Sequence, residues 1–408
     1  MSRLKHIYNY FYQENLMSEK GLTTINLKKI NRSKVYQYIY KTHQTSKMQI
    51  VQDLQMGLST VSQNLNLLEK EGLIDRNGYF DSTGGRKAQA IQIVSDFRIS
   101  IGIGILKNMF HITAIDLYGN AFYTETIALP YSNTEEYYRQ LTDKVRKFIA
   151  ENHYPNEKIL GISIATQGIT SPDNSTVIYG NIMNNTGMKL EDFSRHLPYP
   201  CHLEHDSKSA AFLELWNHPE LDSAVVFLLN RNLGGAIITN HQIHQGSSMH
   251  SGTLEHMCVN PDGPLCYCGN HGCLETYCSA TGVVRTTLAM LEASTGATEL
   301  RNIPEEEITS YAVYKAAMAG DTLAQEVFRQ TGRRIGKACA EIATFLSPEA
   351  FIFFGGLAQA GELLMKPMKE AYDKNVLSLY KNKAKFLTSG LEGATAAILG
   401  ASAIGWNI

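Results

Sequence analysis

The sequence lacks a hydrophobic stretch long enough to cross a membrane, because no apolar run reaches the roughly eighteen residues that a spanning helix needs. Its first residues also lack the apolar core and the cleavage site of a secretory signal peptide. Charged residues are scarce, at 19% of 408 positions, while 44% are hydrophobic, which argues against wholesale disorder and indicates two or three folded domains. We therefore expect a soluble, cytoplasmic protein without membrane insertion.

Cysteine is also sparse and unevenly placed. The chain has seven cysteines, an odd number, and five of them fall between Cys258 and Cys278. A secreted disulfide framework spreads its cysteines through a small domain, so this clustering points to a metal site instead.

Positive charge is concentrated at one end of the chain. Residues 1–90 hold 13 lysines and arginines against seven acidic residues, whereas the remaining positions hold 24 against 32. A basic head on an acidic body is typical of a nucleic-acid-binding domain joined to a domain of another kind. A basic face that meets only solvent is the alternative, since charge alone does not separate the two.

Three short helices are expected in the basic head. Apolar residues at helical spacing run through Asn31–Gln44, a second helix fits Lys47–Gln55, and a third fits Thr60–Gly72 after Ser59 as its N-cap. Gly57 is expected to take a positive φ in the turn before the third helix. This spacing predicts a helix-turn-helix.

The third helix has the composition of a DNA-recognition helix. Val61, Leu65 and Leu68 should face inward, which leaves short uncharged polar side chains that can hydrogen-bond to base edges. The expected base-reading residues are Ser59, Thr60, Ser62, Gln63 and Asn64. A three-helix packing module without a DNA role is the alternative.

A basic wing is expected after the third helix. Leu73–Arg76 and Gly78–Phe80 are predicted to form a short hairpin that leads into Asp81–Lys87. The glycine pair there allows close approach to a phosphate or a minor groove, and Arg86 and Lys87 supply the charge. We expect both basic side chains to contact DNA.

The rest of the chain predicts a two-lobed α/β body. Three alternating strands follow Ile91, then a buried strand at Ile159–Ala165 and a helix at Ser207–Trp216. Strands at Ala224–Asn230 and Gly235–Thr239 repeat the theme. Long helical patterns fill residues 281–346, and Phe351–Gly356 is a further short buried strand. The pattern indicates a duplicated architecture with a cleft between the lobes.

The clustered cysteines include a good ligand set for zinc. His256, Cys266, Cys268 and Cys273 supply one nitrogen and three sulfurs, and four protein ligands would close the shell around a structural ion. Glycines between the last two cysteines let the chain fold back onto the same ion. Cys258 and Cys278 are rival ligands at this stage, and His271 is expected to be a surface turn residue.

These features together resemble the ROK family of repressors, open reading frames and kinases. The matching segments are the Asn31-Arg32 start, the run GLSTVSQNLNLLEKEGLI, the glycine-glycine-arginine wing and NHGCLET after CYCG. The resemblance covers nearly the whole chain from Asn31 and is strongest to repressors of sugar metabolism. It implies zinc at the four residues above and a winged head on a two-lobed actin/hexokinase-like, ribonuclease-H-like body.

On this basis we expect a tail or extra helix at residues 1–30 and a winged helix-turn-helix at 31–88. The first lobe is expected at 91–215 together with 390–408, and the second, with the zinc loop, at 216–389.

The resemblance implies a sugar-effector site in the cleft. The positions that match the family's sugar contacts are Asn181, His205, Asp206, His256 and Glu275. The match is partial, because His205 replaces an asparagine. The glutamate expected before the zinc histidine falls on Thr253, and Glu255 takes a place usually held by glycine. For Asp206 the alternative is a helix N-cap.

Kinase activity is not expected. The two glycine-rich phosphate hairpins of the family's kinases correspond to residues 104–109 and 230–234, which read GILKNM and NRNLG. Residues with side chains replace glycines at points where the backbone of a kinase must come close to phosphate. The aspartate that positions the metal in the kinases is also absent.

The resulting hypothesis is a repressor of carbohydrate genes that binds an operator as a homodimer or homotetramer. Its effector would be a sugar, a sugar phosphate or a phosphotransferase subunit. An ATP-dependent sugar kinase is the alternative.

Overall fold

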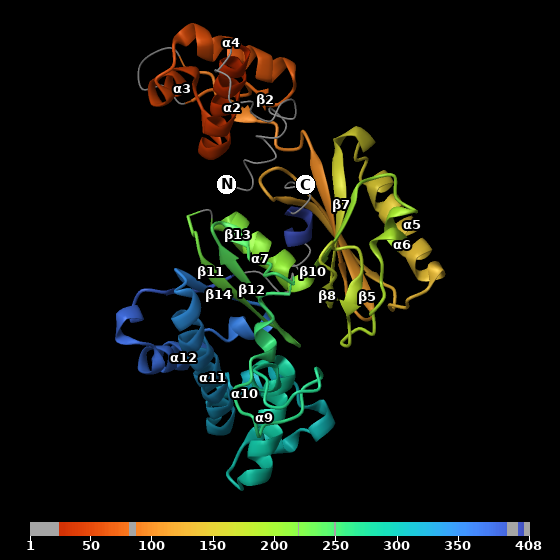
Figure 1. Cartoon of the computed structure of the whole chain (residues 1–408), viewed down its shortest axis with the longest axis vertical. Helices are drawn as coiled ribbons and strands as arrows, with labels where there is room; N and C mark the ends of the chain where they lie inside the picture. The colour runs from red at the N-terminus through yellow and green to blue at the C-terminus, as the bar shows by residue number, and fades with distance from the viewer. Residues whose placement is uncertain (1–23, 81–86, 219, 249, 390–398, 404–408) are drawn as a thin grey trace.

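The structure is a computed structural model that describes residues 24–80, 87–218, 220–248, 250–389 and 399–403. A small N-terminal head lies at one end of a larger body of two lobes (Figure 1). In the described part of the chain, no helix is both long and apolar enough to span a bilayer.

The head combines three helices with a small sheet. Its elements are α2 (Thr24–Thr42), β1 (Gln44–Thr45), α3 (Lys47–Leu54), α4 (Leu58–Lys70), β2 (Ile74–Asp75) and β3 (Ile91–Ile93). The sheet order is β1-β3-β2. Val35, Ile39, Ile50, Val61 and Leu68 are fully buried between the helices and the sheet. The expected inward face of the third helix is therefore present.

The head is larger than its expected limits. The first helix begins at Thr24, so a boundary at residue 30 would cut it. Residues 91–93 pair with β2, Ile74 opposite Ile93, and therefore belong to the head sheet instead of the first lobe. Burial of Ile91 and Ile93 in the head core explains this pairing.

Two details of the turns also differ from expectation. Gln55, with φ 51°, takes the left-handed conformation, whereas Gly57 has φ −61° and is itself the N-cap of α4, so Ser59 lies inside the helix. The wing hairpin is longer than predicted, because Tyr79 bridges Gln89 instead of pairing across Asn77-Gly78. Its expected tip, including Arg86, lies outside the described residues.

The first lobe is built on a five-stranded sheet of order β10-β7-β4-β5-β6. Its strands are β4 (Ile99–Ile105), β5 (Met109–Ile115), β6 (Ala121–Ala128), β7 (Ile159–Thr166) and β10 (Cys201–His205). β4 pairs antiparallel with β5 and parallel with β7. Every residue of β4 is buried, as expected for a central strand.

The second lobe repeats this topology in the order β13-β12-β11-β14-β15. Its strands are β11 (Ala224–Leu229), β12 (Leu233–Thr239), β13 (Gln242–Ile243), β14 (Ala350–Phe354) and β15 (Lys385–Thr388). The central strand again pairs antiparallel with the next strand and parallel with the fourth. The predicted duplicated architecture is thus confirmed.

Helices of the second lobe form a large layer beside its sheet (Figure 1). They are α8 (Glu275–Cys278), α9 (Ala280–Ala293), α10 (Ser310–Met318), α11 (Thr322–Leu346) and α12 (Glu362–Asn375). Two glycines of α11 permit its close contact with α12, since a Cβ at Gly336 would lie 2.1 Å from the Met368 carbonyl oxygen.

Helix α7 (Asp206–Asn217) lies between the two lobes. Ala210 and Leu213 pack into the core beside the second sheet, whereas Phe212 belongs to a cluster that joins first-lobe residues such as Ile115 to the head. Helical residues 399–403 lie against α7, because a Cβ at Gly400 would lie 1.8 Å from the Ser209 carbonyl oxygen. One helix therefore contacts the sheets of both lobes, because it packs against β7 and β10 as well as β11, β12 and β13.

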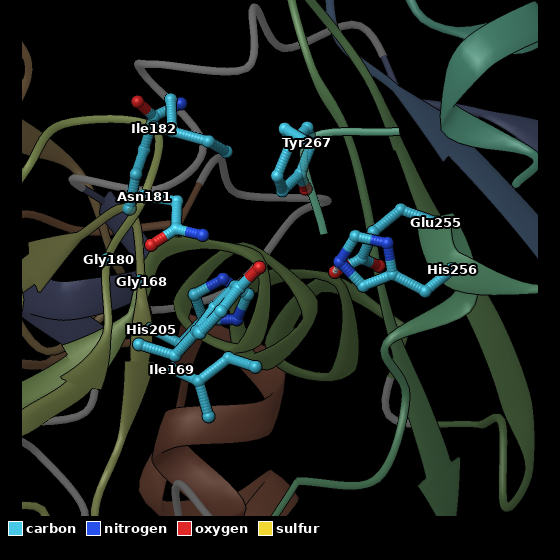
Figure 2. A pocket seen from close by; sticks show the side chains of 11 residues that line it. Gly168, Ile169, Gly180, Asn181, Ile182, His205, Glu255, His256 and Tyr267 are labelled. Atoms are coloured by element: carbon cyan, nitrogen blue, oxygen red, sulfur yellow. Dashed lines mark ion pairs between the residues drawn. The ribbon is translucent and has the colours of Figure 1, made fainter. Parts of the chain in front are cut away.

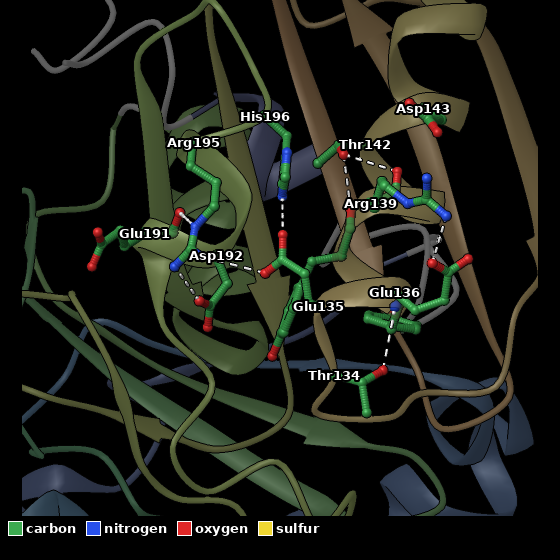
Figure 3. Close-up of polar contacts among 12 residues, drawn as sticks. Thr134, Glu135, Glu136, Arg139, Thr142, Asp143, Glu191, Asp192, Arg195 and His196 are labelled. Carbon is green, nitrogen blue, oxygen red and sulfur yellow. Dashed lines mark hydrogen bonds and ion pairs between the residues drawn. The ribbon is translucent and has the colours of Figure 1, made fainter.

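Polar contacts fix the outer helices of the first lobe, α5 (Glu135–Glu151) and α6 (Leu190–Ser194) (Figure 3). The Glu135 carboxylate accepts from His196 Nε2 at 2.8 Å and meets Arg195 at 3.3 Å. These contacts tie the end of α6 to the start of α5.

Candidate functional site

The outer face of α4 carries most of the predicted base-reading residues. Ser59 and Gln63 are exposed, and Thr60 and Ser62 are half-buried. The N-terminus of α4 has no side-chain cap and no acidic residue in its first turn. This end of the helix can therefore receive a phosphate through its backbone N–H groups.

Asn64 is misplaced in the predicted set. It is only 6% exposed, and its Nδ2 donates to the Thr60 carbonyl at 2.8 Å. Position 64 follows Val61 by about one helical turn, so its side chain faces the head core and not the exposed face of α4. Lys87 of the wing is exposed, as expected.

Aromatic stacking joins the head to the first lobe. The Tyr118 ring, in the β5–β6 turn, stacks on Tyr40 at 5.0 Å and on His43 at 4.6 Å between ring centroids. Asp116 holds that turn by accepting from the backbone N–H of Tyr118 and of Asn120, both at 2.9 Å. Nothing in the sequence pattern had marked Tyr118.

The four predicted metal ligands converge. One ligand atom from each of His256, Cys266, Cys268 and Cys273 lies within 4.8 Å of all the others. Cys268 Sγ and Cys273 Sγ are 3.7 Å apart, and Cys266 Sγ is 3.8 Å from His256 Nδ1. A tetrahedral zinc ion with bonds of about 2.3 Å to sulfur separates two sulfurs by about 3.8 Å. The cluster therefore has the donors and the spacing to hold a metal ion.

Two glycines make this convergence possible, as the sequence predicted. Gly269 and Gly272 both have positive φ, at 93° and 64°. A Cβ on Gly272 would lie 1.5 Å from the Asn260 carbonyl oxygen. The chain therefore doubles back between Cys268 and Cys273 only with glycine at position 272.

The rival cysteines lie outside the cluster. Cys258 is exposed and its Sγ donates to the His271 carbonyl at 3.6 Å. Cys278 is fully buried in the second lobe, where its Sγ contacts the Thr331 carbonyl at 3.8 Å. His271 is exposed in a turn, as expected.

A cavity of about 30 Å³ lies between the lobes. Its lining residues are 167–169, 179–182, His205, Glu255, His256 and Tyr267. Asn181 and His205 on the first-lobe side face Tyr267, Glu255 and His256 from the second lobe (Figure 2). Three of the five predicted effector residues, Asn181, His205 and His256, thus meet at one cavity.

The other two predicted effector residues do not line it. The Glu275 carboxylate accepts from Leu233 N at 2.5 Å and from Asn232 Nδ2 at 3.0 Å. Asp206 is the first residue of α7, with His205 as the N-cap, and its Oδ1 lies 3.3 Å from His205 Nε2. Asp206 is therefore not the N-cap. It contacts His205, which lines the cavity, and does not line the cavity itself.

Glu255 lines the cavity and was not among the predicted residues. Its side chain is nearly buried, Oε2 has no hydrogen-bond partner, and Oε1 lies 4.0 Å from His256 Nε2. Burial, reinforced by the nearby carboxyl groups of Glu275 and Asp206, raises the pKa of Glu255 to about 8. The signal in the sequence is a glutamate directly before a metal-ligating histidine, at a position usually held by glycine in the family.

Asn185 positions the first-lobe wall of the cavity. Its Nδ2 donates to Thr166 Oγ1 at 3.0 Å and to the Gln167 carbonyl at 2.8 Å, and its backbone N–H donates to the Gly180 carbonyl. A Cβ on Gly180 would lie 2.1 Å from Asn185 Oδ1. This buried amide holds the end of β7 beside the turn that carries Asn181.

In both turns that match the kinase phosphate hairpins, backbone groups make hydrogen bonds within the protein. In the second lobe, the Glu275 carboxylate accepts a hydrogen bond from the backbone N–H of Leu233, and Ala280 N donates to the Asn230 carbonyl at 2.9 Å. In the first lobe, Leu106 N donates to the Met109 carbonyl at 2.9 Å, which closes a tight turn with exposed Lys107. A carboxylate on the second turn repels phosphate.

Residues 98–406 match the model of the ROK family, so the chain belongs to that family. It is 26% identical to the N-acetylglucosamine repressor of Escherichia coli O157:H7 over 91% of both chains. It is 28% identical to a glucokinase of Halalkalibacterium halodurans over 66% of this chain and 82% of that one.

A crystal structure of a ROK family transcriptional regulator, a homologue of the E. coli MLC protein, has the same fold. It superimposes with a TM-score of 0.75 at 21% identity and covers 93% of this chain and 97% of its own. The repressor relative and this regulator thus match head and body together, while the glucokinase matches a smaller share.

Proposed function

We propose that the protein is a DNA-binding transcriptional repressor of carbohydrate uptake or catabolism genes, acting on DNA in the cytoplasm. The observation that carries this proposal is a winged helix-turn-helix head joined to a ROK body whose second phosphate turn is occupied by Glu275. The relative named as a repressor spans both parts of the chain.

In this proposal α4 enters the major groove. Ser59, Thr60, Ser62 and Gln63 read base edges, and the wing residues Arg86 and Lys87 contact the backbone. The exposed, uncharged face of α4 and the exposed Lys87 support this arrangement.

The metal is proposed to be structural zinc. One histidine and three cysteines form a closed tetrahedral set that leaves no position open for catalysis. When bound, zinc would cross-link the loop between Glu255 and Glu275. The loop residues would then hold Tyr267, Glu255 and His256 in place as the second-lobe wall of the cavity.

The cavity is proposed as the site of a sugar-type effector. A volume of about 30 Å³ holds about one or two water molecules, so a sugar ring enters only if the two walls separate. The walls belong to different lobes, and α7, which follows His205, contacts the sheets of both lobes. Effector binding would therefore favour a different lobe angle and move the head.

The active assembly is proposed to be a homodimer or homotetramer that places two heads on a palindromic operator. A phosphotransferase subunit is a second candidate effector. It is favoured because Thr253 and His205 stand at two positions where sugar-binding members of the family have a glutamate and an asparagine. Titration with sugars and with that subunit, followed by operator release, separates the two.

The proposal is tested by selecting duplexes from a random library with the purified full chain. We expect a palindromic site bound with an affinity that falls steeply with salt. The same protein, given ATP, magnesium and glucose or N-acetylglucosamine, should produce no sugar phosphate. Turnover together with a lack of sequence-selective binding would instead establish the kinase alternative.

Loss of the Tyr118 ring is expected to uncouple the head from the body. Tyr118→Ala removes two stacking contacts that are worth about 0.5–1.5 kcal/mol each. The heads would be less well positioned, so affinity for a full palindrome should fall about 2- to 10-fold, while affinity for a single half-site stays the same. Fluorescence anisotropy with both duplexes measures the ratio.

Tyr118→Phe is the matched control, because it keeps the ring and removes only a buried hydroxyl that has no hydrogen-bond partner among the described residues. It should behave as the wild type. Equal losses on full and half-sites in Tyr118→Ala would show that the contact stabilises the head itself and does not position it.

A further inference from the structure

The effector cavity has an unusual charge pattern. Among the described residues that line it there is no lysine and no arginine. Glu255 contributes a carboxyl group to the wall, and the carboxyl groups of Asp206 and Glu275 lie near enough to Glu255 to act on it electrostatically. The carboxyl group of Glu255 thus has no guanidinium or ammonium partner among the described lining residues.

Other donors that often bind phosphate are engaged around the cavity. The nearby Lys208 of α7 donates from Nζ to Gln245 Oε1 at 2.6 Å. The Gly180 N–H donates to Thr186 Oγ1 at 2.9 Å. The N-terminus of α7, which could favour an anion, has the carboxyl group of Asp206 in its first turn.

A phosphate monoester is therefore a poor fit. It carries a charge of about −1.5 to −2 at neutral pH and needs cations or several free N–H groups when it is buried. Burying a phosphate beside carboxyl groups without such partners costs more desolvation free energy than its contacts with the wall can supply. A zinc ion held by three thiolates and one imidazole would not reverse this balance, since the ligand charges exceed that of the ion.

Glu255 offers what an uncharged ligand needs. Its side chain is 5% exposed, it lines the cavity, and its Oε2 has no hydrogen-bond partner in the described structure. A buried polar atom left without a partner is costly, so a ligand that supplies one gains affinity. A sugar hydroxyl does so without bringing charge, and the Asn181 amide and His205 imidazole face the same space from the opposite wall.

We infer that the effector of this cleft is an unphosphorylated sugar and not a sugar phosphate, and that Glu255 is the side chain that selects it. The inference rests on the proposed function, because it names the ligand class of the proposed effector site. It assigns to Glu255 the recognition role that the sequence had placed on Asp206 and Glu275.

Matched ligand pairs test the ligand class on the full-length, metal-loaded protein. Calorimetric titration compares glucose with glucose 6-phosphate and N-acetylglucosamine with its 6-phosphate, with xylose as a further unphosphorylated probe. We expect at least one free sugar to bind, and its phosphate ester to bind at least tenfold more weakly. A phosphate ester that binds as tightly as its free sugar, or a panel in which no free sugar binds, overturns the inference.

Operator binding is measured on the same preparation, so the two proposals can fail separately. A protein that binds its selected operator but prefers sugar phosphates remains a repressor and refutes only the ligand class. A protein that binds free sugars but no operator refutes the proposed function.

Variants test the role of Glu255. Glu255→Ala should weaken binding of the free sugar about tenfold or more, and Glu255→Gln, which keeps the size, should weaken it less. Zinc content and operator affinity should stay at the wild-type level in both variants. Glu214→Gln is the matched control, because Glu214 is equally buried with an unpartnered Oε1 but lies outside the lining of the cavity. A folded, zinc-loaded Glu255→Ala protein with wild-type sugar affinity would contradict the role of Glu255.

Discussion

Replacing Cys273 by serine is expected to remove the metal and to destabilise the body strongly. Cys273 is fully buried, and its Sγ lies 3.7 Å from that of Cys268. A site saturated a thousandfold above its Kd contributes about 4 kcal/mol, which corresponds to a fall of roughly 8 to 16 °C in Tm. Elemental analysis should find zinc falling from about one ion per chain to nearly none.

The same variant should also lose operator control, because the metal loop carries the second-lobe wall of the effector cavity. Cys258→Ser is the matched control: Cys258 lies in the same loop, is exposed and stands outside the ligand cluster. It should keep its zinc and its Tm. A Cys273→Ser protein that still binds one zinc per chain would show that another residue completes the site.

Replacing Gln63 by alanine is expected to weaken binding of the selected operator by about 1 to 3 kcal/mol, or about 5- to 150-fold. Gln63 is exposed on α4, and glutamine can make two hydrogen bonds to an adenine edge. The loss should fall on one base pair of each half-site. Binding of the variant to operators mutated at each position in turn locates that base pair.

Lys87→Ala separates base reading from charge. Lys87 is an exposed wing residue, and loss of one phosphate contact should lower the salt slope by about one unit while weakening all sequences alike. Gln63→Ala should leave the salt slope unchanged. If Gln63→Ala instead weakened every sequence equally, the recognition face of α4 would be assigned wrongly.

The sequence alone was enough for features whose parts are close together in the chain. His256, Cys266, Cys268 and Cys273 fall within one short loop, and local glycines dictate how that loop folds back. The inward face of α4 followed from helical spacing, and the duplicated lobes followed from alternating strands. Such local patterns restrict the backbone conformation strongly enough to predict these features from the sequence.

Tertiary packing decided the orientation of single side chains. Asn64 was expected to face solvent, but packing of α4 in the head leaves it only 6% exposed. Glu275 was expected in the cleft, but a backbone N–H of the β11–β12 turn, 42 positions away, captures its carboxylate. The partner of Glu275 cannot be seen in the spacing of the residues themselves.

The family, the head, the metal tetrad and the loss of both phosphate hairpins were thus determined by the sequence, because each depends on residues that are neighbours in the chain. Which carboxyl group faces the cavity, how little space the cavity has and how Tyr118 joins head to body were decided only by the tertiary structure. Each of these depends on where two lobes and a head come to rest against one another, and that position results from many weak long-range contacts that no single segment encodes.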